Sequence, residues 1–479
     1  MVVYLAAEGR VRAINYREKA PGAAHPRMFL DEVGKVRRDL HGGHGLAVGV
    51  PGAAAGWDYA LKTYGTQDLE EVIGPALRFA EQGFEVSPTL SAISKDEYEK
   101  VLANSGEDST YLNLGLPLEP GDIFRNPDLA ATFRTLAEKG VREFYEGVTA
   151  GRIVSAVRDA GGILTAEDLA SYTVEDQEPL RGTYKDLILF TVRPPASGGL
   201  HVIQILNILE NWEAGRWEAE PADYIHRFCE ALRFVFADRA RYLGDPDFVD
   251  VPVEGLISKS HAAAIAALID PGRVRNDYPS GDFDPGGEKS DNTTHLCVID
   301  EEGNIVSLTQ SINDFFGSGI VPGGTGFLLN NHMDDFSDDP GSVNAPRPGR
   351  RPTSSMGPLI VFRAGKPYLA LGSPGGPRIF PTLAQIIVNV VEFGMGIDQA
   401  IEAPRFFSFS SHGKAGPLSV ESRIPGEVVR RLQELGHEVE VREAYDRFFG
   451  GAQGLLLTPG KSVIRGGADS RRDGSGAGY

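Results

Sequence analysis

The stretch SDNTTHLCVIDEEGNIVSLTQSIN (residues 290–313) contains two apolar runs separated by the turn residues Glu301–Gly303. A three-residue loop whose last residue can adopt a positive φ is a common connection in a β-hairpin. We therefore predict antiparallel strands at residues 294–300 and 304–311. A polar segment becomes an apolar strand where the first of these strands begins.

In the predicted register Asp300 pairs with Asn304. Stepping back along both strands sets Thr293 opposite Ser311, with Asn313 on the same face. Directly opposed Cβ atoms lie about 4.5 to 5.5 Å apart, so the two hydroxyls can form a hydrogen bond. A loop one residue longer would turn Ser311 to the other face, and a threonine in a strand is in itself ordinary.

A threonine hydroxyl is a weak nucleophile unless a base stands beside it, and the chain contains no convincing GxSxG elbow. Cleavage of the peptide bond between Asn292 and Thr293 would free an α-amino group, whose unperturbed pKa is about 7.7 to 8.0. Such an amine could accept the hydroxyl proton of its own residue near neutral pH. We hypothesise that the Thr293 hydroxyl attacks the Asn292 carbonyl and that water resolves the resulting ester.

Composition narrows the possible functions. The 479 residues carry a formal charge of −19, are 41% hydrophobic, and contain no apolar run near the roughly 18 residues of a membrane helix. We therefore expect a soluble, unexported chain with neither nucleic acid nor membrane as a partner. Cys229 and Cys297 lack ligand spacing and are predicted to be buried free thiols. His41 and His44 in HGGHG lack a third ligand nearby, so we expect no metal and no cofactor.

Periodicity predicts helices punctuated by Gly and Pro in the first two thirds, and hairpins after residue 290. Neighbouring strands joined by tight turns, with helices in blocks, favour antiparallel sheet covered by helices over a doubly wound parallel sheet. The predicted helices lie at 69–80, at 166–169 behind a Thr165 cap, behind a Ser197 cap through Leu209, and at 224–236, 383–391 and 428–435, and the further strands at 187–192, 359–362 and 368–371.

Acyl transfer needs hydrogen-bond donors where negative charge develops. Gly375 and Gly376 in SPGGPR supply adjacent backbone N–H groups without Cβ obstruction, and they form the candidate oxyanion hole. The alternative is a plain Pro-Gly turn. Ser354 and Ser355 in RPTSSMGP are either turn hydroxyls or donors to a substrate carboxylate.

Charged candidates come from two further segments. Asp334 and Asp335 in LNNHMDDF belong either to a solvated acidic loop or to a binding site. Arg17 in NYREKAP is either a surface arginine or a fork that grips a carboxylate. The glycine-rich stretches GVPGAAAGW and PASGGLH match no phosphate-binding pattern, so helix packing or turns explain them.

Taken together, these segments resemble the γ-glutamyltranspeptidase family of N-terminal-nucleophile hydrolases over almost the whole chain. The segments that carry the resemblance occur in the family's order: NYREKAP, PPASGGLHVIQILNILE, ADRARYLGDPDF, DNTTHLCVIDEEGNIVSLTQSIN, GFLLNNHMDDFS, RPTSSMGP, GSPGGPRI, EAPRF and the C-terminal AGY.

The resemblance implies an α+β fold, a four-layer αββα sandwich of two antiparallel sheets between helix layers. It implies a single catalytic domain over residues 1–479, made as a precursor that cleaves itself into a large subunit, 1–292, and a small subunit, 293–479, which form a heterodimer. Family members usually begin with a leader, a helix and a strand that would precede Met1, so we expect this chain to be truncated. Relatives are often periplasmic or secreted, which leaves the compartment open.

The resemblance also implies roles for the candidate residues. Thr293 would be the nucleophile, Ser311 its support, and Gly375 with Gly376 the oxyanion hole. The α-carboxylate of a γ-glutamyl group would bind Arg17, Ser354 and Ser355, and its α-amino group would bind Asn313 and Asp335. His332 stands where the family often has glutamate or glutamine. This difference weakens recognition of the amino group or shifts it to Asp335 and Asn313.

The implied activity is that of a γ-glutamyltransferase and glutathione hydrolase. The γ-amide of glutathione or a related donor is cleaved through an acyl-enzyme, which water or the amine of an amino acid or peptide then resolves. Two alternatives stay open: an acylase of the same superfamily that acts on glutaryl or cephalosporin-type side chains, and a non-catalytic relative that binds γ-glutamyl compounds.

Overall fold

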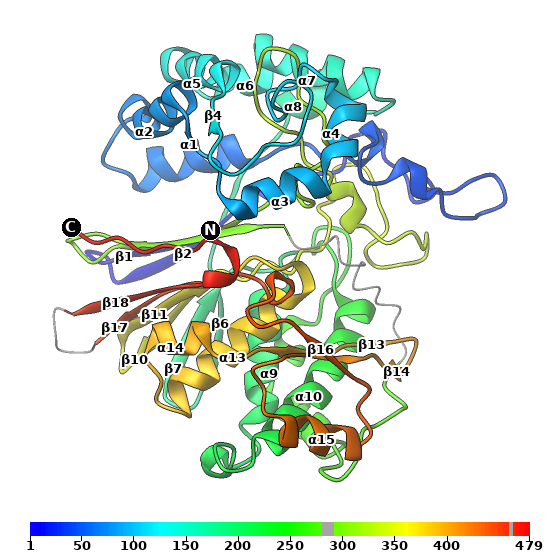
Figure 1. The fold of residues 1–479 in the computed structure, drawn as a ribbon, viewed down its shortest axis with the longest axis vertical. Coiled ribbons are helices and arrows are strands. Elements are labelled where there is room, and N and C mark those ends of the chain that lie inside the picture. Colours follow the sequence, from blue (N-terminus) through cyan, green and yellow to red (C-terminus); the bar gives the residue numbers. More distant parts are fainter. Residues whose placement is uncertain (280–291, 459–462) are drawn as a thin grey trace. The chain divides into compact units, whose positions relative to one another are not determined.

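The computed structural model describes residues 1–279, 292–458 and 463–479, so Ser290 and Asp291 of the hairpin motif lie outside the described residues. The chain forms two compact units (Figure 1). Unit 1 comprises Met1–Ala13, Gln177–Gln310 and Thr353–Tyr479, and unit 2 comprises Ile14–Asp176 and Ser311–Pro352.

The predicted hairpin forms in unit 1 as strands β8 (Thr294–Ile299) and β9 (Ile305–Gln310). They pair antiparallel, from Thr294 opposite Gln310 to Ile299 opposite Ile305, which confirms the predicted register. Gly303 has a φ of 85°, and the Asp300 N–H donates to the Asn304 carbonyl over 3.2 Å, as the turn requires. The pairing of Thr293 with Ser311, one step beyond this ladder, stays a prediction.

Unit 1 contains two large antiparallel sheets. In the first, β2, β1, β9 and β8 are neighbours in that order, and the second has the order β18-β17-β11-β10-β7-β6. The predicted strands at 187–192, 359–362 and 368–371 are confirmed as β7, β10 and β11. The remaining bounds are β1 (Val2–Leu5), β2 (Arg10–Asn15), β6 (Leu180–Tyr184), β7 (Leu187–Thr191), β10 (Leu359–Arg363), β11 (Lys366–Gly372), β17 (Gln453–Leu457) and β18 (Ile464–Ala468).

Strand β10 shows how the layers of unit 1 are held together. Ile360 and Phe362 belong to the apolar core between the two sheets, whereas Leu359 and Val361 belong to the core under the helices. Alternation along a strand sends successive side chains to opposite faces, so the second sheet is buried on both. Each fully buried Leu, Ile or Phe side chain stabilises the fold by about 1.5–3 kcal/mol.

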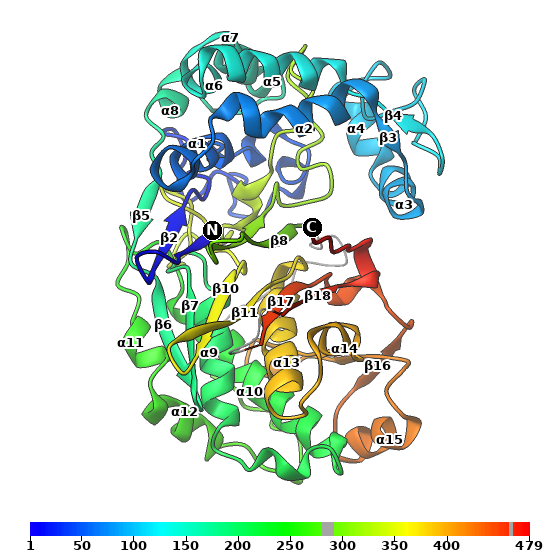
Figure 2. The ribbon, with the colours of Figure 1, turned by 90° about the vertical axis from the view of Figure 1, so that its left-hand side faces the viewer.

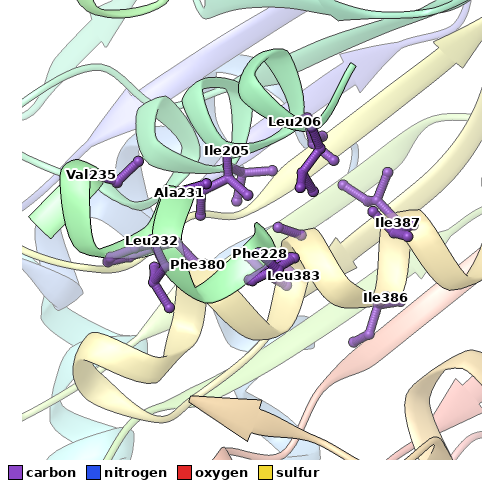
Figure 3. Close-up of a cluster of buried hydrophobic side chains, with 14 of the residues drawn as sticks. Ile205, Leu206, Phe228, Ala231, Leu232, Val235, Phe380, Leu383, Ile386 and Ile387 are labelled. Atoms are coloured by element: carbon purple, nitrogen blue, oxygen red, sulfur yellow. The ribbon is translucent and has the colours of Figure 1, made fainter. Parts of the chain in front are cut away.

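The helical layer on the second sheet consists mainly of α9 (Gly198–Leu209), α10 (Pro221–Tyr242) and α13 (Ile379–Val391). Helix α9 packs on β6 and β7, α13 packs on β11, and α10 packs on α9 (Figure 2). Figure 3 shows the apolar side chains of the three helices meeting. The residues of this contact are Ile205, Leu206, Phe228, Ala231, Leu232, Val235, Phe380, Leu383, Ile386 and Ile387. All three helices were predicted from the spacing of apolar residues along the chain.

The rest of unit 1 is made of short elements. A small third sheet has the order β12-β15-β16, and its β15–β16 pair is parallel, unlike the antiparallel pairs predicted from the turns. The elements are α11 (Val253–Leu256), α12 (Lys259–Ala266), α14 (Ile397–Glu402), β12 (Phe406–Phe407), β13 (Ser410–Ser411), β14 (Lys414–Ala415), β15 (Leu418–Glu421), α15 (Gly426–Glu434) and β16 (Val439–Arg442), with 3₁₀ turns η3 (Ala214–Arg216), η5 (Gly376–Arg378), η6 (Arg447–Phe449) and η7 (Ser470–Arg472).

Unit 2 is mostly helical. Helix α2 ends at Gly83, as predicted, and starts at a capping box of Asp68 and Glu71 that was not predicted. Thr165 caps α8 through a capping box with Asp168, as predicted. The elements are η1 (Arg38–Leu40), η2 (Gly45–Ala47), α1 (Ala53–Tyr64), α2 (Leu69–Gln82), β3 (Phe84–Glu85), α3 (Pro88–Asp96), α4 (Tyr98–Ser105), β4 (Ile123–Phe124), α5 (Pro127–Lys139), α6 (Arg142–Glu146), α7 (Val148–Asp159), α8 (Ala166–Ala170), β5 (Glu175–Gln177), which runs into unit 1, and η4 (His332–Asp335).

Hydropathy adds one finding. Within residues 1–279, 292–458 and 463–479, no helix combines the length and the apolar character needed to cross a membrane.

A buried chain of side chains joins α10 to the segment that follows α15. The Nε2 of His226 lies 2.8 Å from the Asp270 carbonyl, and its Nδ1 lies 2.9 Å from Nε2 of His437. Arg233 donates to Nδ1 of His437 over 3.3 Å. The ring nitrogens of both histidines have hydrogen-bond partners only while His437 is neutral. Burial, together with the neighbouring Arg233, lowers the pKa of His437 to about 2.

We predict that His437→Gln weakens the acid sensitivity of unit 1. Because the pKa of folded His437 is below its unfolded value of about 6.5, its contribution is present above that pH and is lost as the pH falls below it. Between about pH 4 and 6.5, the free energy of unfolding measured with urea should depend less steeply on pH in the variant, by up to roughly 1.4 kcal/mol per pH unit. Exposed His25→Gln serves as the control, and an unchanged slope in His437→Gln would contradict the assignment.

Candidate functional site

The start of β8 brings the predicted nucleophile against the predicted scissile bond. Asn292 is buried, Thr293 is half-buried, and the next residue, Thr294, is exposed. The Thr293 hydroxyl donates a hydrogen bond to the Asn292 carbonyl oxygen. The attacking oxygen and the carbonyl that it would attack are therefore already neighbours in the uncleaved chain.

His295 supports this end of the strand, a role that the sequence analysis did not assign. Its Nδ1 lies 2.8 Å from the Thr309 hydroxyl, and its Nε2 lies 3.1 Å from the sulfur of Cys297. A Cβ on Gly372 of β11 would lie 2.1 Å from the ring, so this strand needs glycine where the imidazole packs. Burial lowers the pKa of His295 to about 3, which leaves the ring neutral and unsuited to act as the general base. Cys229 and Cys297 are free thiols, as predicted, but only Cys229 is buried; Cys297 is half-buried.

The glycine pair of SPGGPR lies between β11 and α13. Gly375 has a φ of 131° and Gly376 a φ of 53°, values that favour glycine. Within the described part of the chain neither N–H is used in a hydrogen bond, whereas the next amide, of Arg378, donates to the Gly375 carbonyl over 2.9 Å. Two unused donors just before the N-terminus of α13, where the helix dipole is positive, can stabilise a developing oxyanion.

Ser354 and Ser355 are held by the PASGGL segment. Ser197 is the N-cap residue of α9, as predicted, but its hydroxyl makes no capping hydrogen bond and instead donates to the Ser354 carbonyl over 2.8 Å. A Cβ on Gly198 would lie 2.1 Å from the Ser355 carbonyl oxygen, which explains why the segment is rich in glycine. The Ser354 hydroxyl accepts from the Met356 N–H over 3.1 Å, as a turn hydroxyl does, and the Ser355 hydroxyl accepts from Arg239 over 3.4 Å.

Arg17 of unit 2 is buried, with its side chain only 3% exposed, so the surface-arginine alternative is wrong. Its guanidinium forms ion pairs with Glu18 and Asp335 and donates from Nε to the Pro352 carbonyl over 3.2 Å. Burial raises the pKa of Glu18, although Arg17 opposes this shift. Glu18 was not predicted as a site residue, because only its position next to Arg17 in the sequence pointed to it.

The acidic segment is the 3₁₀ turn η4, which half-buries Asp334 and Asp335, so it is not a solvated loop. His332 starts the turn with Nδ1 3.2 Å from the Glu18 carboxylate. Burial lowers the pKa of His332 well below its usual value, so the ring is neutral beside the arginine. Arg17, Glu18, His332 and Asp335 thus form one cluster within unit 2.

Ser311 and Asn313 are brought together just after β9. The Asn313 N–H donates to the Ser311 hydroxyl over 2.9 Å, and the Asn313 side chain donates to the Asn331 carbonyl over 3.1 Å. Asn313 adopts a left-handed φ of 74°, which Asn tolerates better than most residues. The candidates therefore divide between the units: Asn292, Thr293, Ser354, Ser355, Gly375 and Gly376 lie in unit 1, and Arg17, Ser311, Asn313, His332 and Asp335 in unit 2.

The histidines of HGGHG have other partners. His41 pairs with Asp334 and Asp338, and the His44 ring accepts from the Leu46 N–H at the start of η2. Among the residues that the structure describes, no group of three or more His, Cys, Asp or Glu side chains is arranged to hold a metal ion.

A mixed fold of stacked antiparallel sheets and helices, with a threonine at the start of a strand, is that of an N-terminal-nucleophile hydrolase, and comparison with solved structures agrees. The cephalosporin acylase from Bacillus halodurans superposes with a TM-score of 0.85 at 28% identity, covering 100% of this chain and 86% of that one. The predicted fold class is therefore confirmed.

The profile of the family described as Gamma-glutamyltranspeptidase matches residues 1–479, and the chain belongs to this family of enzymes. The glutathione hydrolase proenzyme of Escherichia coli (strain K12) is 38% identical over 488 residues, which cover 98% of this chain and 82% of the relative. The acylase ACY 1 proenzyme of Pseudomonas sp. (strain SE83) is 38% identical over 475 residues, covering 98% and 83%.

We predict that Gly375→Ala destabilises unit 1 by about 1–3 kcal/mol, because alanine at this φ is strained and its Cβ would lie 3.1 Å from Cα of Gly450. Gly426→Ala, where a Cβ meets nothing within 4 Å, is the matched control. Urea unfolding measures both variants. Equal free energies of unfolding for Gly375→Ala and Gly426→Ala would show that the glycine pair does not need its left-handed backbone.

Proposed function

We propose that the chain is a self-processing γ-glutamyl hydrolase and transferase that cleaves the γ-glutamyl amide of glutathione and related compounds. The observation that carries the proposal is the ion pair between buried Arg17 and half-buried Asp335, two opposite charges at one place in unit 2. Membership of the family and the glutathione hydrolase relatives support it. The roles of Arg17, Asp335, Thr293, Gly375 and Gly376 are part of the same proposal.

The γ-glutamyl head group is a zwitterion, with a carboxylate and an ammonium on one carbon. In the described structure the guanidinium of Arg17 and the carboxylate of Asp335 satisfy each other. A bound head group can exchange this pair for two new ones, its carboxylate on the arginine fork and its ammonium on Asp335. Because the charges are replaced like for like, the exchange leaves no buried charge unpaired. The 30% exposure of the Asp335 side chain gives the ammonium access.

Maturation proceeds by acyl shift. The Thr293 hydroxyl oxygen adds to the Asn292 carbonyl carbon, the carbon–nitrogen bond breaks, and the Thr293 nitrogen takes a proton to become the free α-amine. Water then hydrolyses the ester, which leaves a carboxylate on Asn292 and restores the hydroxyl. The contact between this hydroxyl and the Asn292 carbonyl supports the first step, and the word proenzyme in the relatives' names supports processing.

Turnover repeats the same chemistry on the substrate. The α-amine of Thr293 takes the hydroxyl proton, the oxygen adds to the γ-carbonyl carbon, and the N–H groups of Gly375 and Gly376 stabilise the oxyanion. The amine product leaves with the proton. Water or the amine of an amino acid or peptide then attacks the γ-glutamyl ester and frees the threonine.

A second candidate function is hydrolysis of glutaryl or cephalosporin-type side-chain amides. The observation in its favour is His332, a neutral, buried ring beside Glu18, which offers no negative charge of its own to an ammonium group. The acylase relative supports it too. Comparing kcat/KM for γ-glutamyl and glutaryl anilides separates the two functions, and a preference for the glutaryl substrate would select the second.

We predict that Thr293→Ala abolishes chain splitting and activity together, because it removes the only oxygen proposed to attack in both reactions. Denaturing mass spectrometry after purification should show fragments 1–292 and 293–479 for the original chain and one intact chain for the variant. Thr294→Ala, one residue further along and exposed, is the matched control and should split normally. Splitting that persists in Thr293→Ala would reject this nucleophile, and an original chain that stays whole would indicate a non-catalytic relative.

We predict that Arg17→Lys raises KM for γ-glutamyl anilides about 10- to 100-fold, since an ammonium cannot form the forked pair with a carboxylate and a lost hydrogen bond to a charged group costs about 1.5–3 kcal/mol. Steady-state kinetics on the matured protein measures the change. Arg37→Lys, an exposed arginine paired with Asp39 in the same unit, is the control. If both variants keep the original KM, Arg17 does not bind the substrate carboxylate.

A further inference from the structure

We propose that His41, on the glycine-rich loop of residues 41–45, is a positioning residue for recognition of the substrate's α-amino group. It holds Asp334 directly. Asn331 connects Asp334 to Asn313, and Asp335 follows Asp334 in the same 3₁₀ turn; Asn313 and Asp335 are the two residues proposed to meet that group. The inference rests on the proposed function and adds to it a specificity determinant outside the pocket.

His41 and Gly42 together hold the carboxylate of Asp334. Nδ1 of His41 lies 2.9 Å from one carboxylate oxygen, and the N–H of Gly42 donates to the other over 2.7 Å. Gly42 has a φ of 63°, a conformation that favours glycine, and this turn lets the ring and the next N–H reach the same carboxylate. Consecutive residues of the loop thus hold both oxygens of one side chain.

The His41 ring is positively charged at neutral pH. Its Nε2 lies 3.3 Å from Asp338, and the Phe29 ring stacks on the imidazole with centroids 4.3 Å apart. Burial by itself lowers the pKa of His41, but the hydrogen bonds to Asp334 and Asp338 outweigh it and raise the pKa to about 9. At neutral pH the ring is an imidazolium that donates from Nδ1 to Asp334 and forms an ion pair through Nε2 with Asp338.

Asn331 connects Asp334 to Asn313. The Asn331 amide donates to Asp334 over 3.2 Å and to Asp314 over 2.8 Å, and its oxygen accepts from the Asp314 N–H over 3.0 Å. The Asn331 carbonyl accepts from the Asn313 side chain over 3.1 Å. A continuous set of hydrogen bonds therefore runs from the loop to the asparagine proposed to contact the amino group.

Asp335 is adjacent to Asp334 in η4, a single 3₁₀ turn of four residues, and 3₁₀ hydrogen bonds hold such turns poorly. Met333 and Phe336 bury the apolar side of the turn in a cluster with Phe29. The polar side is fixed by side chains: Asp334 by His41, and the Asp335 carbonyl by the Asn344 amide over 2.7 Å. Loss of the His41 contact weakens the first of these attachments, because it leaves Asp334 held only by the Gly42 N–H and Asn331.

The test compares ligands that differ only in the amino group. L-glutamate and glutarate compete with a γ-glutamyl anilide, and the ratio of their inhibition constants measures how strongly the site recognises the ammonium. In His41→Gln we expect KM for the γ-glutamyl anilide to rise and the preference for glutamate to fall by roughly tenfold, the value of one hydrogen bond to a charged group. Affinity for glutarate and kcat should stay close to those of the original protein.

The matched control is His44→Gln, on the same loop, whose ring contacts Leu46 and not η4. It should keep the original preference. Should His41→Gln fail to mature, Asp334→Asn replaces it, because it removes the same charged contact and keeps the side-chain shape.

The outcomes separate the two proposals. An unchanged ratio of inhibition constants in His41→Gln or Asp334→Asn overturns the positioning role and leaves the proposed function intact. Equal loss of affinity for glutamate and glutarate also overturns it, because a merely structural role would weaken both. An original protein that matures but does not turn over the γ-glutamyl anilide overturns the proposed function, and the inference with it.

Discussion

The antiparallel pairing of β8 with β9 is the interaction on which the rest of the candidate chemistry depends. Paired backbone groups and alternating side chains fix this register, since a slip of one residue would exchange the buried and exposed faces of both strands. The register sets the end of β8, and with it the place of Thr293. His295, packed against the glycine of β11, holds the same strand end from within unit 1.

Buried charges are the second organising feature. The arginine of NYREKAP is enclosed with two carboxylates and a neutral histidine, and removing charges from water is costly unless they are paired. Such a cluster adds little to stability for its size. It is better explained as a site whose internal pairs stand in for the charges of a ligand, and this is the physical content of the proposed γ-glutamyl specificity.

Much of this architecture follows from local sequence rules. The hairpin register was predictable because three turn residues determine it, and α2 and α8 were predictable because their caps are local. The glycine pair proposed as the oxyanion hole could be identified from the need for unobstructed backbone N–H groups. Contacts between distant segments could not be predicted: nothing near Ser197 indicates that its hydroxyl donates to Ser354. Asp335, which pairs with Arg17, and Asp334, which pairs with His41, lie about 300 residues further along the chain, and single-sequence patterns carry no information on such pairs.

The unequal exposure of Arg17 and Asp335, 3% and 30%, has a kinetic consequence. In the proposed site, an incoming γ-glutamyl head group meets the Asp335 carboxylate before the guanidinium, and the net charge of −19 on the chain makes the surrounding field attractive to cations. Capture is therefore steered by the ammonium end and slows as ionic strength rises. Simple amines compete at this first encounter, even though they cannot form the second ion pair.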